Sequence, residues 1–153
     1  MPVFRKLASR VSPVGLTFTA SLLLSLIAWL DSTVNRDGML YVKAATAFGE
    51  GGFSAAKDVF NWPFLPVAMG VVSQISGLSP GTAGYVLNAC VMAGACALMV
   101  AGIESRQREI AWAACLTVLA LPGLNEYRNE LLREFGCWFF VMLSLWLARR
   151  WSN

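Results

Sequence analysis

Ionisable residues gather in one short stretch, DSTVNRDGMLY, directly after the first long apolar run of the chain. The stretch holds the carboxylates of Asp31 and Asp37 and the guanidinium of Arg36, and it leads into a periodic segment with Tyr41 and Lys43. A carboxylate can take a proton from a hydroxyl group or orient that hydroxyl for attack. If the apolar run crosses a membrane, these ionisable groups lie at the boundary between the hydrocarbon core and water. They are therefore placed for chemistry at a membrane surface.

A second polar stretch, NEYRNELLRE, precedes the last apolar run. On a continuous helix Glu126, Glu130 and Glu134 would share one face, with Arg133 beside Glu130. Like charges at this spacing repel one another, so we expect a cation, a bound divalent metal or the first polar stretch to offset the repulsion. The alternative is a charged helix end that faces water.

The composition indicates whether the chain folds in a membrane or in water. Of the 153 residues, 57% are hydrophobic, 14% are charged and none is histidine, and the mean hydropathy is +0.59. A soluble domain is typically about 45–50% apolar and about 25% charged. We therefore expect an all-α integral membrane protein. A soluble helical bundle is the alternative, because short apolar runs are often core helices.

Four apolar runs predict four transmembrane helices, at residues 14–30, 81–103, 110–124 and 135–149. The first two are uncharged over 17 and 23 residues, which meets the roughly 20 residues that a spanning helix needs. The other two are uncharged over only 16 and 14 residues, so each must borrow length from its flanks.

The charges on either side of these runs predict the orientation. Segments 1–13, 104–109 and 149–153 hold seven basic and two acidic residues in 24 positions, whereas 31–80 and 125–134 hold five basic and seven acidic residues in 60. Basic residues concentrate on the cytoplasmic side of membrane proteins. We therefore expect a cytoplasmic lead, a short cytoplasmic turn and both termini in the cytoplasm.

The long outer loop at 31–80 carries its own helical patterns. Apolar positions predict a helix over 38–48 that ends at the GEGG sequence, a further helical turn over 53–60, and an interfacial helix over 66–78. Counting 66–78 as a membrane span would reverse the C-terminal half of the chain, against the charge bias.

Small residues are frequent in the second apolar run, among them Gly94 and Ala97, and such a face usually serves close helix packing. The four cysteines form no CxxC pair and histidine is absent, so we expect buried packing residues rather than a zinc site.

Several function classes are excluded by what the chain lacks. It has no GxxxxGK, GxGxxG or GxSxG motif. Its basic residues lie on two sides of the expected bilayer, which argues against a nucleic-acid partner. The four predicted spans lack the internal ionisable residues that are typical of channels and transporters.

Three segments carry a family resemblance and occur in the expected order, NRDGMLYVKAATAF, WPFLPVAMGVVSQISGLSP and PGLNEYRNELLREFGCWFF. They resemble the amino-terminal part of GT-C class membrane glycosyltransferases, specifically bacterial relatives of dolichyl-phosphate-mannose-protein mannosyltransferases. The resemblance implies a multi-pass enzyme of the bacterial inner membrane. Such an enzyme transfers a sugar from a polyprenyl-phosphate donor to an acceptor on the outer, periplasmic face.

The resemblance also implies roles for individual residues. In that family an acidic residue in the first outer loop acts on the acceptor, and Asp37, followed by Gly38 and Tyr41, matches this position best. Asp31 is the second choice. Because members of the family are considerably longer, the chain corresponds to their front section, and both a fragment and a small stand-alone relative are expected to look like this.

A lipid phosphate that leaves with negative charge calls for Arg, Lys or a metal ion. Arg128 and Arg133 are the best candidates on the outer side, Lys43 is a weaker one, and Glu126 and Glu130 complete the candidate substrate site. No spacing specifies a metal site, so the cofactor stays unknown, with a divalent cation open.

Structural roles compete with these assignments. Asp37 can instead cap the helix that follows it, and Arg133 can pair with Glu130 or Glu134. The alternative function is a non-catalytic membrane scaffold or assembly subunit. It would bind another copy or a partner membrane subunit through the small-residue face at Gly94 and Ala97.

Overall fold

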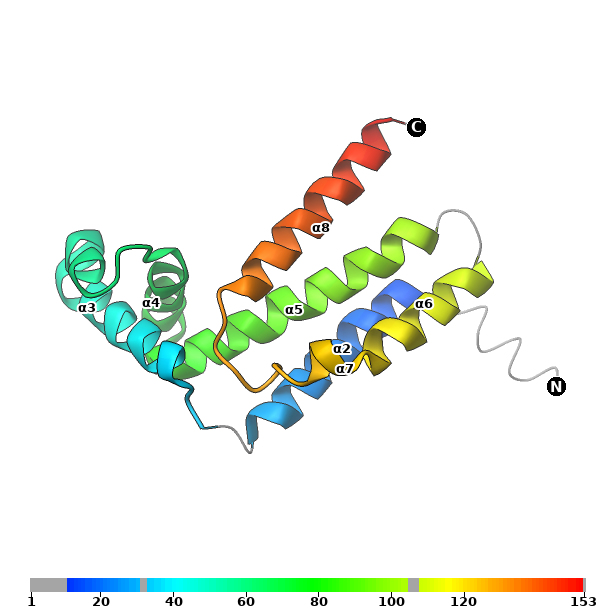
Figure 1. The fold of residues 1–153 in the computed structure, drawn as a ribbon. Coiled ribbons are helices and arrows are strands. Elements are labelled where there is room, and N and C mark those ends of the chain that lie inside the picture. The colour runs from blue at the N-terminus through cyan, green and yellow to red at the C-terminus, as the bar shows by residue number, and fades with distance from the viewer. Residues whose placement is uncertain (1–10, 31–32, 105–107, 153) are drawn as a thin grey trace.

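The computed structural model describes residues 11–30, 33–104 and 108–152, and this part of the chain is all-helical (Figure 1). Its seven helices are α2 (Pro13–Leu30), α3 (Arg36–Val59), α4 (Phe64–Ser76), α5 (Pro80–Glu104), α6 (Arg108–Ala120), α7 (Pro122–Asn125) and α8 (Glu134–Trp151). The all-α prediction is therefore confirmed. Asp31 lies outside the described residues.

Helix α5 is the centre of the fold, because it packs against α2, α3, α4, α6 and α8. Figure 1 shows α2, α5, α6 and α8 running back and forth, so that the ends of α2 and α6 and the starts of α5 and α8 lie at the same end. Helices α3 and α4 lie at this end too, which we call the α3–α4 end. At the opposite end, Arg108 Nη2 donates to the carbonyl oxygen of Val11 at 2.8 Å.

Of the described helices, two are long and apolar enough, by length and composition, to cross a membrane. They are α2, with a mean hydropathy of 1.8, and Pro80–Ile103 of α5, with 2.1. Helix α6 has only 13 residues, so the predicted 110–124 helix is too long. It ends because Leu121 is extended (φ −66°, ψ 113°), which is the backbone that a following proline favours.

The burial pattern of α2 is the reverse of that in a soluble amphipathic helix. The side chains of Thr17, Ser21 and Ser25 are buried, and they recur every fourth residue on one face. Leu23 and Ile27, by contrast, are 54% and 61% exposed. The polar stripe of this helix faces the protein and its apolar surface faces outward.

Helix α3 corrects one expectation for the outer loop and confirms another. It begins at Arg36, where the Asn35 side-chain oxygen accepts a hydrogen bond from the Gly38 amide at 3.1 Å, so Asn35 and not Asp37 is the cap. The helical geometry is interrupted at Gly52, the last residue of the GEGG sequence, where φ is 72° and ψ is −160° and glycine is favoured. The expected break between two helical segments is therefore present, and the two segments of α3 meet there at a kink.

The close packing predicted for the second apolar run is confirmed, and it occurs within the chain. A Cβ at Gly84 would lie 2.7 Å from the Met69 methyl group of α4. A Cβ at Gly94 would lie 2.6 Å from the Phe139 ring of α8. Glycine at these positions lets α4 and α8 approach α5 closely.

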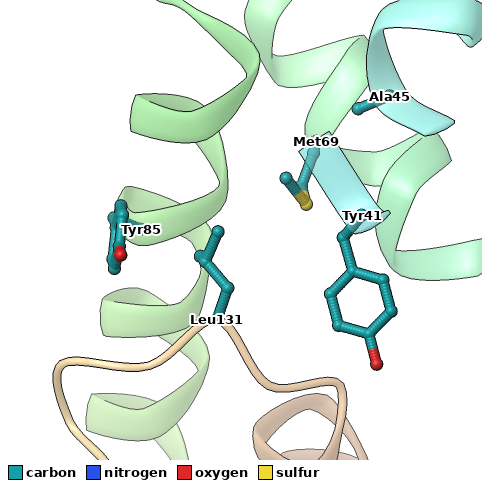
Figure 2. Packing of buried hydrophobic residues seen from close by; sticks show 5 residues of the cluster. All are labelled: Tyr41, Ala45, Met69, Tyr85 and Leu131. Carbon is teal, nitrogen blue, oxygen red and sulfur yellow. The ribbon is translucent and has the colours of Figure 1, made fainter. Parts of the chain in front are cut away.

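Buried side chains from four segments meet at the α3–α4 end. Figure 2 shows the cluster, which consists of Tyr41 and Ala45 of α3, Met69 of α4, Tyr85 of α5 and Leu131 of the loop between α7 and α8. Hydrophobic contact in this cluster fixes α3 and α4 against the helices that run the length of the molecule.

The Gly94 contact predicts opposite effects for one substitution at two glycines. Gly94→Ala places a methyl group against the Phe139 ring and should lower the free energy of unfolding by about 1–3 kcal/mol. Gly136→Ala is the matched control in α8, where an added Cβ meets nothing within 4 Å. It should raise the free energy of unfolding by up to about 1 kcal/mol, because alanine favours a helix. Unfolding in mixed micelles, followed by circular dichroism, measures both, and equal stability of the two variants would contradict this packing.

Candidate functional site

Two adjoining open cavities, of about 390 and 350 Å³, lie at the α3–α4 end between α4 and α8. Both are lined by Phe64, Leu65, Arg133 and Cys137, and we call the combined space the α4–α8 groove. The remaining lining is aromatic or aliphatic, apart from Glu134 and Asn88. Arg133 is the one cation among these lining residues.

Arg133 ends the segment of turns at 126–133, which we call the 126–133 loop, and it directly precedes α8. Its side chain is 56% exposed and pairs with Glu134 at 3.4 Å, which is one of the two pairings expected from the sequence. An exposed ion pair of this kind contributes only about 0–1 kcal/mol. A stronger anion can therefore displace the Glu134 carboxylate from Arg133.

Tyr41 joins the groove to the first polar stretch. The residue is buried in the cluster of Figure 2, and its hydroxyl points away from Ala45 and Met69. Burial raises the pKa of the Tyr41 phenol above its usual value of 10.0, the positive charge of Arg133 opposes this, and the carboxylates of Asp37 and Glu134 add to it. The phenol thus stays protonated at neutral pH and can donate a hydrogen bond.

Asp37 lies in the first turn of α3, one turn before Tyr41, and its side chain is exposed. A hydrogen bond from Asn35 to Glu130 brings the two polar stretches of the sequence together. Tyr41 and Arg133 line the same cavity, whereas Asp37 lines neither cavity and acts on the Tyr41 phenol through its charge.

Other predicted site residues lie elsewhere. Lys43 is exposed and lines neither cavity, because residues two apart on a helix do not share a face. Glu126 is exposed at the end of α7. Glu130 accepts a hydrogen bond from Asn35 Nδ2 at 3.3 Å, so it connects the second polar stretch to the start of α3.

The predicted helical face of Glu126, Glu130 and Glu134 is wrong, because residues 126–133 form turns and irregular backbone rather than a helix. Asn88 of α5 explains the difference. Its amide donates to the carbonyl oxygens of Glu130 and Leu132 at 3.4 and 3.2 Å, and these are backbone groups that a continuous helix would use itself.

Arg128 is 5% exposed and lines neither cavity. Its Nη1 donates to the carbonyl and hydroxyl oxygens of Ser21 at 3.0 and 2.9 Å and to the Ser25 hydroxyl at 2.9 Å. Burial lowers the pKa of Arg128, and the adjacent Cys96 thiol opposes that shift. Of the two arginines predicted to bind phosphate, only Arg133 is in the groove.

Sequence reasoning missed several residues of the site. The groove has an aromatic wall of Phe60, Trp62 and Phe64, and the sequence analysis assigned none of these three side chains to the candidate site. Two signals were present: aromatic residues surround Pro63, and the polar residues of the first apolar run recur every fourth position.

The described residues contain no group of three or more His, Cys, Asp or Glu side chains placed to hold a metal ion. All four cysteines are free. Cys96 and Cys115 are buried as expected, whereas Cys90 and Cys137 are exposed, which corrects the prediction for those two.

Comparisons of the chain with protein-family models, with curated proteins and with solved structures found no match.

Proposed function

We propose that the chain binds a polyprenyl-phosphate-linked sugar in the α4–α8 groove, as the amino-terminal part of a glycosyltransferase that acts on the outer face of the membrane. The observation that carries this proposal is an open, largely apolar groove that contains one arginine. This residue, Arg133, directly precedes the first turn of α8 and lines both cavities of the groove. The apolar walls suit an isoprenoid tail. The guanidinium suits a phosphate, with which arginine forms charge-assisted and often bidentate hydrogen bonds.

The proposal includes a membrane with α2, α5, α6 and α8 as its four spans, α3 and α4 at the outer interface, and both termini in the cytoplasm of a bacterium. The outward-facing leucine and isoleucine of α2 support lipid around that helix. The basic residues Arg108, Arg149 and Arg150 lie at the ends of α6 and α8 away from the groove, which agrees with the positive-inside rule.

Helix α6 is the shortest proposed span. Its 13 residues extend over roughly 20 Å at the α-helical rise. Helix α7 follows α6 after one extended residue, Leu121. The chain therefore continues from α6 through α7 toward the α3–α4 end.

The reaction follows from the group around Tyr41. Asp37 takes the proton of an acceptor hydroxyl as its oxygen attacks the anomeric carbon of the sugar. A new carbon–oxygen bond forms there while the bond to the lipid phosphate breaks, and the bonding electrons stay on the phosphate. Arg133 stabilises the charge that develops on this leaving group, and the Tyr41 hydroxyl donates a hydrogen bond beside it.

The scaffold alternative finds no support in the small-residue face of α5. Gly94 lies against Phe139 of the chain's own α8, and Ala97 is only 8% exposed. That face is therefore occupied within the molecule, and we propose no second function from it.

Donor binding tests the role of Arg133. In lipid nanodiscs, the wild type should bind a short-chain polyprenyl-phosphate mannose saturably, and Arg133→Gln should bind it about 10–100-fold more weakly, which is the loss expected for a charge-assisted hydrogen bond. Arg150→Gln removes the same charge at the other end of α8 and should bind as the wild type does. Equal affinity of both variants would overturn the proposed phosphate contact.

Sugar transfer tests the role of Asp37. Membranes that contain Asp37→Asn should transfer radiolabelled mannose from the donor about 10²–10⁴-fold more slowly than wild-type membranes, because a general base contributes a factor of this size. Asp58→Asn, an exposed carboxylate in the last turn of the same helix, is the matched control. Transfer by Asp37→Asn at the wild-type rate would remove Asp37 from the mechanism.

A further inference from the structure

Arg128 is a buried positive charge that pairs with no carboxylate among the described residues. It reaches from the 126–133 loop to the polar face of α2, and among the described residues its side-chain partners are Ser21, Ser25 and Asn125. The Asn125 side-chain oxygen accepts from Nε at 2.6 Å. The Cys96 thiol also lies beside the guanidinium. The oxygen partners are all neutral, so none of them balances the charge of the guanidinium.

One nitrogen of the guanidinium is left over. Nη2 is buried and has no hydrogen-bond partner, although it carries two N–H groups. A buried ionised group without full compensation is costly, and buried charges in proteins are normally paired. Deprotonation does not relieve this cost, because arginine keeps its proton in proteins.

The neighbouring serines add two further donors. Each hydroxyl oxygen accepts a hydrogen bond from Nη1, and no described residue accepts the hydroxyl hydrogen of Ser21 or Ser25. The two serines are one helical turn apart on α2, so both hydroxyls face the guanidinium from the same side. The two hydroxyl hydrogens and Nη2 thus form a cluster of donors with a net positive charge.

We infer that this cluster binds a small inorganic anion such as chloride, between α2 and the 126–133 loop. A lipid phosphate does not fit these observations, because Arg128 is 5% exposed and lines neither cavity of the groove. Water would satisfy Nη2 but would leave the positive charge uncompensated. An anion satisfies both, and it would hold the 126–133 loop to α2 independently of any substrate in the groove.

Anion-dependent stability tests this inference. The purified full chain in nanodiscs should unfold at a midpoint several degrees higher in sodium chloride than in sodium gluconate of the same ionic strength. The midpoint should rise with chloride concentration and level off, because a ligand that binds only the folded state stabilises it by mass action. Tryptophan fluorescence during heating measures the midpoint.

Two kinds of variant separate this site from a general salt effect. Arg150→Gln removes an exposed arginine in the last turn of α8 and should keep the chloride dependence, whereas Arg128→Gln should lose it. If Arg128→Gln does not fold, Ser21→Ala combined with Ser25→Ala retains the charge and should weaken chloride binding about tenfold or more. A wild-type midpoint that is the same in chloride and gluconate would overturn the inference, and so would equal chloride dependence in the serine double variant and the wild type.

Discussion

The attachment of the 126–133 loop to the helices beneath it is the constraint on which the site depends. Arg128 anchors the loop to α2 through Ser21 and Ser25, and Asn88 of α5 binds its backbone at two carbonyl oxygens. Leu131 fills the centre of the cluster shared with α3 and α4. Because the loop is held from three sides, Arg133 at its end is placed at the start of the groove, although Arg133 itself is exposed.

The same attachment determines where α8 begins and how far it stands from α4. Among the described helices, α8 packs against α5 alone, along a face where Gly94 admits the Phe139 ring. The groove remains between α8 and α4, with Cys137 and Phe64 on its two sides. In the proposed membrane arrangement this gap between two helices opens to lipid, and the proposed lipid-linked donor would reach Arg133 through it.

Periodicity and charge in the sequence were sufficient to predict the helical class and the long apolar helices, because uncharged runs of this length have few other folds available. The family resemblance, not periodicity, led to Asp37 and Tyr41 as candidate site residues, and the charge of a phosphate leaving group led to Arg133. Periodicity and charge failed where side chains compete for the backbone. The amide of Asn88 binds the carbonyl oxygens of residues 130 and 132, which a continuous helix would use itself.

The two arginines show the limit of prediction from residue type. Arg128 and Arg133 are both outer-side arginines five residues apart, and the sequence offers no reason to separate them. The structure separates them by burial. Arg128 is enclosed by serine hydroxyls of α2, a helix about 100 residues earlier in the chain, whereas the side chain of Arg133 is exposed and lines the groove. Only the tertiary fold connects residues that are so distant in the chain.

Occupation of the groove by a lipid phosphate is tested most directly at Cys137, which lines both cavities one helical turn after Arg133. The rate at which a membrane-permeant maleimide modifies each cysteine is measured by mass spectrometry, with and without saturating polyprenyl phosphate. Cys90 is also exposed but lines neither cavity, so it is the internal control. We expect the lipid to slow modification of Cys137 several-fold and to leave Cys90 unchanged. Unchanged modification of Cys137 at saturating lipid would contradict a donor site in this groove.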